Sequence, residues 1–128
     1  MPSPDDAFQY AIWRVVPSVE RGEALNVGVV VYCRRRQFLE ARISDDDTRL
    51  RTLSPDLDVP ALRTHLDGML RVAAGDPAGG AVAQLPQSER FGWLTAASST
   101  IVQPSPIHTG LCSDPQAVLD RLFTRLVA

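Results

Sequence analysis

Two acidic residues, an arginine, an amide and two glycines lie within residues 20–28, directly before an apolar run. Such groups bind carboxylates or phosphates and can move protons. The simpler alternative is a tight turn in which Gly22 takes a positive φ and the charges are solvated. Asn26 weakens that alternative, because an amide inside a strand pattern needs a partner where it is buried. We expect Arg14, on a neighbouring strand, to meet Glu23 or Asn26 if they share a face.

A second cluster, Glu89–Leu94, places Arg90 and Trp93 three residues apart. On a helix this spacing puts the two side chains next to each other. An arginine beside a tryptophan can bind a base or a carboxylate, and it equally forms a surface cation–π pair, which is the more common arrangement. The spacing leaves both interpretations open.

Hydroxyls, an amide, a histidine and a glycine surround a short apolar stretch within residues 98–110. Two prolines restrict the backbone there and so fix the directions of Ser105 and His108, while Gln103 supplies the amide. A histidine in such a loop can act as an acid, a base or a phosphate contact near neutral pH. The alternative is a hydrogen-bonded loop with a partly exposed histidine. The sequence contains no nucleophile elbow, HExxH motif, Walker loop or GxGxxG motif, so we infer no catalytic triad.

Arginine alone supplies the positive charge, with 13 arginines, no lysine and a net charge of −2. GC-rich codon usage is the simpler explanation, and a need for planar guanidinium forks at some sites is the alternative. A slightly acidic chain has no overall field that attracts nucleic acid, so such binding would need a local patch. Arg34–Arg36 is one candidate patch, although a solvated hairpin turn is the simpler interpretation.

Cys33 and Cys112 form neither a CxxC motif nor a Cys/His metal spacing, so we expect no metal and no cofactor. The N-terminus lacks the basic and apolar regions of a signal peptide. The longest apolar stretch, residues 27–33, is too short to span a bilayer. We therefore expect a cytoplasmic protein with reduced thiols that does not enter a membrane.

Hydrophobic periodicity predicts the elements that must position these groups. Asp58 followed by a proline in the first turn is typical of a helix start, and Gly75 of a helix end. We expect strands over residues 8–16, 24–33, 38–43 and 100–103, and helices over residues 45–53, 59–73, 89–94 and 113–126.

Asn26 and Gly28 are unusual residues for the most clearly predicted strand. Regular alternation predicts that they share one face, with Val27 and Val29 on the other. A glycine inside a strand often marks a bulge or the close approach of another group.

This element order predicts an α+β fold. We expect a small, mainly antiparallel sheet, formed by a three-stranded meander and a fourth short strand, with helices packed on one face. Residues 7–128 should form a single domain behind a disordered N-terminus of residues 1–6.

Several of these segments resemble the small bacterial and phage proteins catalogued as domain of unknown function 3037. The resemblance covers nearly the whole chain, and its most specific part is the Arg-Gly-Glu and Asn-Val-Gly pattern of residues 21–28. The segments that carry it are residues 10–17, 20–29, 89–91 and 99–110. The family has no established activity to carry over. Its members are often encoded beside a kinase that resembles the HipA type, which implies a partner or regulatory role.

We therefore expect a small non-enzymatic module that binds a protein partner, a HipA-like kinase encoded nearby, through a polar groove at the sheet. The expected binding residues are Arg14, Glu23, Asn26, Arg90, Gln103, Ser105 and His108. The alternative is an enzyme or nucleotide-binding protein that uses the same groove, with His108 as its acid–base group and two arginines as anion-binding forks. That alternative requires these groups to converge within hydrogen-bond reach.

Overall fold

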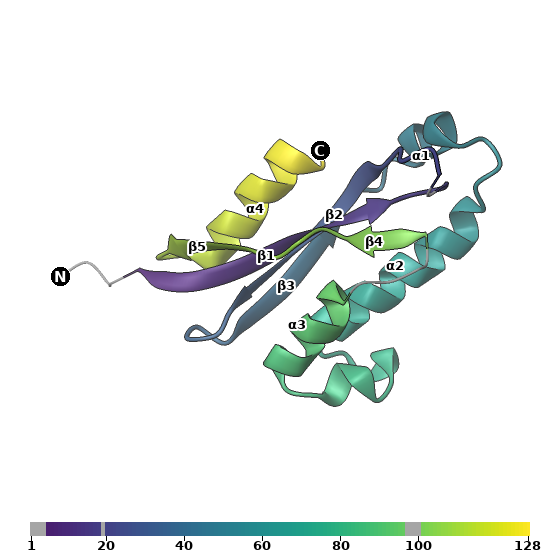
Figure 1. Cartoon of the computed structure of the whole chain (residues 1–128). Coiled ribbons are helices and arrows are strands. Elements are labelled where there is room, and N and C mark those ends of the chain that lie inside the picture. Colours follow the sequence, from purple (N-terminus) through teal and green to yellow (C-terminus); the bar gives the residue numbers. More distant parts are fainter. Residues whose placement is uncertain (1–4, 19, 97–100) are drawn as a thin grey trace.

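A computed structural model describes residues 5–18, 20–96 and 101–128 of the chain. Its regular elements follow one another as strands, helices, short strands and a last helix (Figure 1). The elements are β1 (Asp6–Val15), β2 (Leu25–Cys33), β3 (Phe38–Ile43), α1 (Asp47–Leu53), α2 (Val59–Ala74), η1 (Pro77–Gly79), η2 (Val82–Gln84), α3 (Gln87–Thr95), β4 (Val102–Pro104), β5 (His108–Cys112) and α4 (Pro115–Leu126).

The described strands form one antiparallel sheet in which β3, β2 and β1 are the predicted meander. Beyond β1, two short strands pair with its outer edge, β4 near its end and β5 near its start. The α+β class and the mainly antiparallel sheet are thus confirmed, and the expected fourth strand is present as β4, although residue 100 lies outside the described residues. Strand β5, within a segment expected to be a loop, was not predicted. Strand β1 begins at Asp6, within the segment expected to be disordered, and residues 1–4 lie outside the described part.

Helices cover both faces of the sheet rather than the one face that the sequence analysis expects (Figure 1). Helices α1, α2 and α3 pack against the face that carries Trp13, and α4 packs against the opposite face. The physical reason lies in β2, where Val29 and Val31 face α4 and Val30 faces α2 and α3. A strand covered on both sides is apolar at successive positions, as the run from residue 27 to 33 is.

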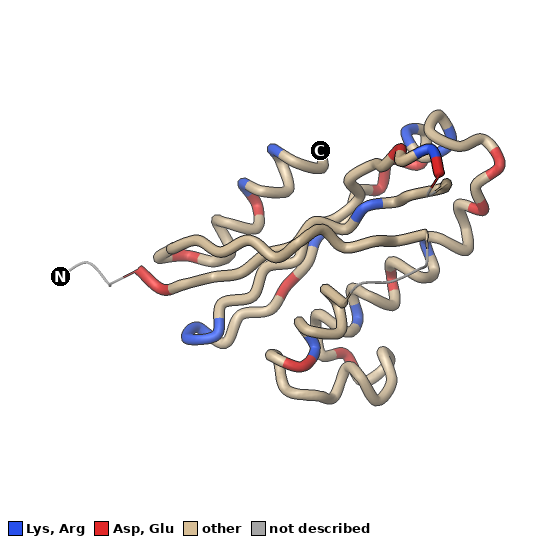
Figure 2. The backbone as a smooth tube through the Cα atoms, in the orientation of Figure 1, with Lys and Arg blue, Asp and Glu red and all other residues tan. Residues whose placement is uncertain are grey.

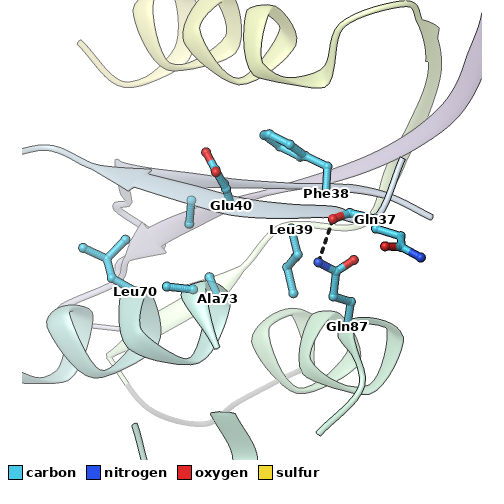
Figure 3. Close-up of a pocket in the computed structure, with 9 residues that line it drawn as sticks. Gln37, Phe38, Leu39, Glu40, Leu70, Ala73 and Gln87 are labelled. Carbon is cyan, nitrogen blue, oxygen red and sulfur yellow. Dashed lines mark hydrogen bonds between the residues drawn. The ribbon is translucent and has the colours of Figure 1, made fainter. Parts of the chain in front are cut away.

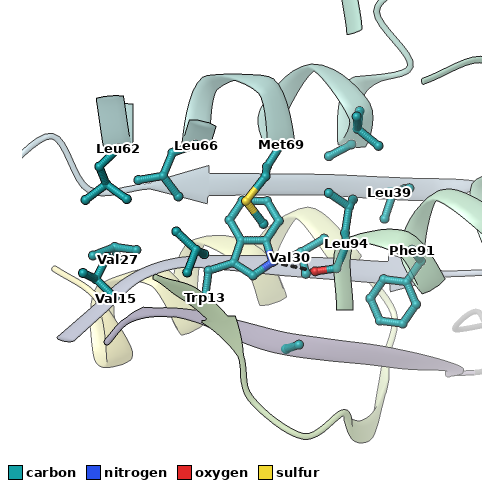
Figure 4. Close-up of a cluster of buried hydrophobic side chains, with 14 of the residues drawn as sticks. Trp13, Val15, Val27, Val30, Leu39, Leu62, Leu66, Met69, Phe91 and Leu94 are labelled. Carbon is teal, nitrogen blue, oxygen red and sulfur yellow. Dashed lines mark hydrogen bonds between the residues drawn. The ribbon is translucent and has the colours of Figure 1, made fainter. Parts of the chain in front are cut away.

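Trp13 lies fully buried at the centre of the larger core (Figure 4). Its ring packs among side chains of α2, including Leu66 and Met69, and its indole Nε1 donates to the Leu94 carbonyl of α3 at 3.1 Å. A buried indole N–H needs such an acceptor, so this hydrogen bond helps to hold α3 on the sheet, together with the packing of Phe91 and Leu94 in the same core.

A β-bulge lies opposite Trp13 and changes the alternation of β2. Trp13 is opposite Gly28 and Arg14 is opposite Asn26, which leaves Val27 as the extra residue. Val27 therefore packs in the core around Trp13, whereas Val29 packs under α4, contrary to the regular alternation that the sequence predicts. A Cβ added at Gly28 would lie 2.9 Å from Trp13 Cε3, so the glycine serves both predicted roles, bulge and close approach.

Helix α2 begins and ends where the sequence predicts, to within one residue. The Asp58 carboxylate accepts from the Ala61 N–H, and Gly75 ends the helix in the left-handed conformation with φ 69°. Helix α4 is capped by Asp114, whose carboxylate accepts from the N–H groups of Gln116 and Ala117. None of the helices in the described ranges combines the length and apolar character that a bilayer crossing requires.

We expect Gly28→Ala to lower the free energy of unfolding by about 1–3 kcal/mol, because the added methyl meets the Trp13 ring and the Arg42 carbonyl. Gly68→Ala is the matched control. A Cβ at Gly68 meets nothing within 4 Å, so this variant should gain about 0.5–1 kcal/mol from better helix propensity. Urea unfolding measures both, and equal effects at the two glycines would contradict this role of the Trp13 contact.

Candidate functional site

Three of the seven expected binding residues lie side by side across the sheet. Arg14 on β1 is directly opposite Asn26 on β2 and Gln103 on β4. Residues that are directly opposite in an antiparallel pair point to the same face. The bulge decides which face this is, because it turns Asn26 towards α4 rather than towards the Trp13 core.

The polar groups of this row bind the backbone of distant segments. The Arg14 guanidinium donates to the carbonyls of Gln103 at 3.4 Å and Pro104 at 3.2 Å. The Asn26 amide donates to the Leu126 carbonyl at the end of α4 at 3.0 Å. Each contact satisfies backbone carbonyls that the short strand β4 or the helix end leaves open. Arg14 and Asn26 therefore hold β4 and α4 on the sheet.

Ser105 lies buried where β4 has ended and β5 has not yet begun. Its N–H donates to the Ile12 carbonyl at 2.8 Å, and its Oγ accepts from the Ile12 N–H, also at 2.8 Å. The hydroxyl in turn donates to the Pro106 carbonyl at 2.9 Å. The side chain thus replaces the backbone acceptor that a continuous strand would supply, and it keeps β4 and β5 on the same edge.

His108 is exposed and its ring stacks on that of Tyr10, with 5.1 Å between the ring centroids. Tyr10 and Arg14 share a face of β1, but they are four residue steps apart along the strand, or about 13 Å. His108 and Arg14 therefore lie on one face without converging within hydrogen-bond reach. The geometric condition for the enzyme or nucleotide-binding alternative is not met at this pair.

Glu23 forms an exposed ion pair with Arg21, with 2.6 Å between Arg21 Nη2 and Glu23 Oε1. Gly22 between them has a φ of 70°, as the tight-turn interpretation predicts. Exposed pairs of this kind contribute about 0–1 kcal/mol to stability. Arg14 donates to Gln103 and Pro104 rather than to Glu23. This segment therefore combines a solvated turn with a partly buried amide at Asn26.

Arg90 lies on the other side of the sheet from the row around Arg14. Its Nη1 donates to the carbonyls of Val72 at 3.0 Å and Ala73 at 2.8 Å, and its Nε donates to the Leu85 carbonyl at 2.9 Å. These contacts place a positive charge at the C-terminus of α2, where the helix dipole favours it. The structure therefore does not bring all seven expected residues into one groove.

A hollow that the sequence analysis did not anticipate opens along β3, between that edge strand and the helices α2 and α3 (Figure 3). Its volume is about 520 Å³. Leu39 points into it from the strand, and the Gln87 amide donates to the Gln37 carbonyl at 2.9 Å at one end. Its floor is formed by α2 residues, namely Leu70, Ala73 and Ala74. The sequence feature that corresponds to this hollow is the pair of adjacent small residues at the end of α2, Ala73 and Ala74.

The arginine turn lies beside this hollow, at the tip of the β2–β3 hairpin (Figure 2). Arg36 pairs with Asp6, with 2.9 Å between Nε and Oδ2, while Arg34 and Arg35 are exposed. A second hollow, lined in part by Tyr32, Arg34 and Gln37, shares Gln37 and Gln87 with the first and lies nearer the turn. The positive charge of Arg34 thus lies at the second hollow.

Both cysteines are buried, unbridged and in the core beneath α4. Burial raises the pKa of the Cys112 thiol, and the neighbouring Cys33 raises it further. The Cys33 thiol donates to the Ala7 carbonyl at 3.5 Å. Within the described ranges, no three His, Cys, Asp or Glu side chains form a group that could hold a metal ion.

Comparison with known proteins gives one match. The sequence model of the family described as protein of unknown function (DUF3037) matches residues 10–127. The chain therefore belongs to this family. No curated protein and no solved structure matches the chain.

We expect Arg90→Ala to lower the free energy of unfolding by about 2 kcal/mol, because it leaves the last carbonyls of α2 without their charged donor. Arg71→Ala, on the exposed face of the same helix end, should change it by less than about 0.5 kcal/mol. Thermal and urea unfolding of the two variants make the comparison. Similar stabilities would show that the Arg90 contacts do not hold α2 and α3 together.

Proposed function

We propose that this DUF3037 protein is a small binding module of the bacterial cytoplasm, which acts by binding a protein partner and not by catalysis of its own. One observation carries the proposal. The hollow along β3, called the β3 groove below, opens at a strand edge with which no further described strand pairs, and such an edge is a common site for binding another chain.

The candidate polar residues support this view through their contacts. Four of them direct polar groups at backbone atoms of their own chain, namely Arg14, Asn26, Ser105 and Arg90. A group that acts in catalysis must instead reach a substrate atom from a site that both can enter. The proposed binding surface is therefore the β3 groove, in place of the polar groove that the sequence analysis expects.

The partner that we propose is a kinase resembling the HipA type, encoded beside the gene for this chain. The reason is that members of the family are often encoded beside a kinase of this type. A module of this size would bind such a kinase as a regulatory or adaptor subunit.

Co-expression of the tagged chain with the neighbouring HipA-like kinase tests this proposal. We expect the two proteins to co-elute on size exclusion at about 10 µM, as a stable regulatory complex would. An unrelated protein kinase from the same host serves as the control and should elute separately. Separate elution of both kinases, with the module folded by circular dichroism, would contradict the proposed partner.

A further inference from the structure

Strand β3 is an edge of the described sheet, since β2 is the strand that pairs with it there (Figure 1). The pairing sets which of its backbone groups are open. The Ser44 N–H donates to the Val27 carbonyl at 2.7 Å, in register with the β2–β3 pairs. Because antiparallel bonding alternates, Leu39 and Ala41 direct their N–H and C=O groups away from β2. The edge thus offers regularly spaced donors and acceptors.

The hollow lies directly below these groups (Figure 3). Small side chains of α2, Ala73 and Ala74, leave the space between helix and strand edge open. In an added strand, every second side chain would point to this side of the sheet. A volume of about 520 Å³ is large enough for side chains of moderate size.

Arginines lie at the hairpin end of β3 (Figure 2). Arg34 and Arg35 are exposed at the hairpin. Arg34 lines the second hollow, of about 460 Å³, which shares Gln37 and Gln87 with the first. Among the described residues, no carboxylate forms an ion pair with either arginine. Two such neighbouring guanidinium groups favour an acidic side chain or a terminal carboxylate at this end.

We propose that the β3 groove binds an extended acidic peptide segment of the partner, which pairs with β3 as one more strand of the sheet. Alternate small apolar side chains of this segment enter the hollow above Ala73 and Ala74, and its acidic residues lie beside Arg34 and Arg35. The inference rests on the proposed function only for the partner's identity. The recognition itself follows from the strand edge, the hollow and the charge.

A phage-displayed library of linear peptides of about 12 residues, panned against the full chain, tests this binding mode. We expect the selected peptides to carry alternating apolar residues next to Asp or Glu. A bound synthetic peptide should slow amide hydrogen exchange at Leu39 and Ala41, because their N–H groups become donors to the new strand. Protection confined to another surface would overturn the proposal.

Three variants make the test specific. Ala74→Trp fills the groove from an exposed position and should weaken peptide binding by about tenfold or more. Ala61→Trp, at an exposed position near the other end of α2, is its matched control and should bind as the wild type does. Arg34→Glu combined with Arg35→Glu leaves the groove open and should also weaken peptide binding by about tenfold.

The outcomes separate this inference from the proposed function. A kinase complex that survives both the Ala74→Trp and the double arginine variants would overturn the binding mode and leave the partner intact. Peptides that bind at β3 without any kinase complex would support the binding mode and remove the proposed partner. Recovery of no peptide would overturn the inference. So would sedimentation of the wild-type chain as a dimer that becomes monomeric in Ala74→Trp, because a second copy would then cover β3.

Discussion

The burial of Trp13 is the constraint on which the rest of the structure depends. Its ring fills the centre of the core between the sheet and α2, and its indole N–H joins the sheet to α3 at Leu94. The ring leaves no room for a side chain at Gly28, and the adjoining bulge shifts the alternation of β2 by one residue. Asn26 consequently points to the opposite face, where it holds the end of α4. One aromatic side chain thus determines how helices attach to both faces.

The polar residues that the sequence analysis selected as candidate binding residues also hold elements of the fold together. Arg14, Asn26, Ser105 and Arg90 each satisfy backbone atoms at the end of an element or at a break between two. A small sheet with two short edge strands has many such atoms, and burying them without partners costs about 1–3 kcal/mol each. The segments that carry the family resemblance are therefore also the segments that close the fold. The open edge of the described sheet lies elsewhere, at β3.

Local signals predicted the parts of the fold that local interactions determine. The meander of β1, β2 and β3 and the bounds of α2, with Asp58 and Gly75 at its ends, follow from short-range patterns. The arrangement of the polar residues could not be predicted, because it depends on contacts between segments far apart in the chain. Ser105 meets Ile12 and Arg90 meets the end of α2 only once the sheet and helices have packed. The groove along β3 arises in the same way, from the distance between a strand and a helix.

The central claim is that β3 has an open edge over a groove, and amide hydrogen exchange of the free protein tests it most directly. The account predicts alternation along the strand. Leu39 and Ala41 should exchange much faster than Glu40 and Arg42, whose N–H groups face β2. Uniformly slow exchange along β3 in the unbound protein would contradict the account, because it would mean that this edge is already covered.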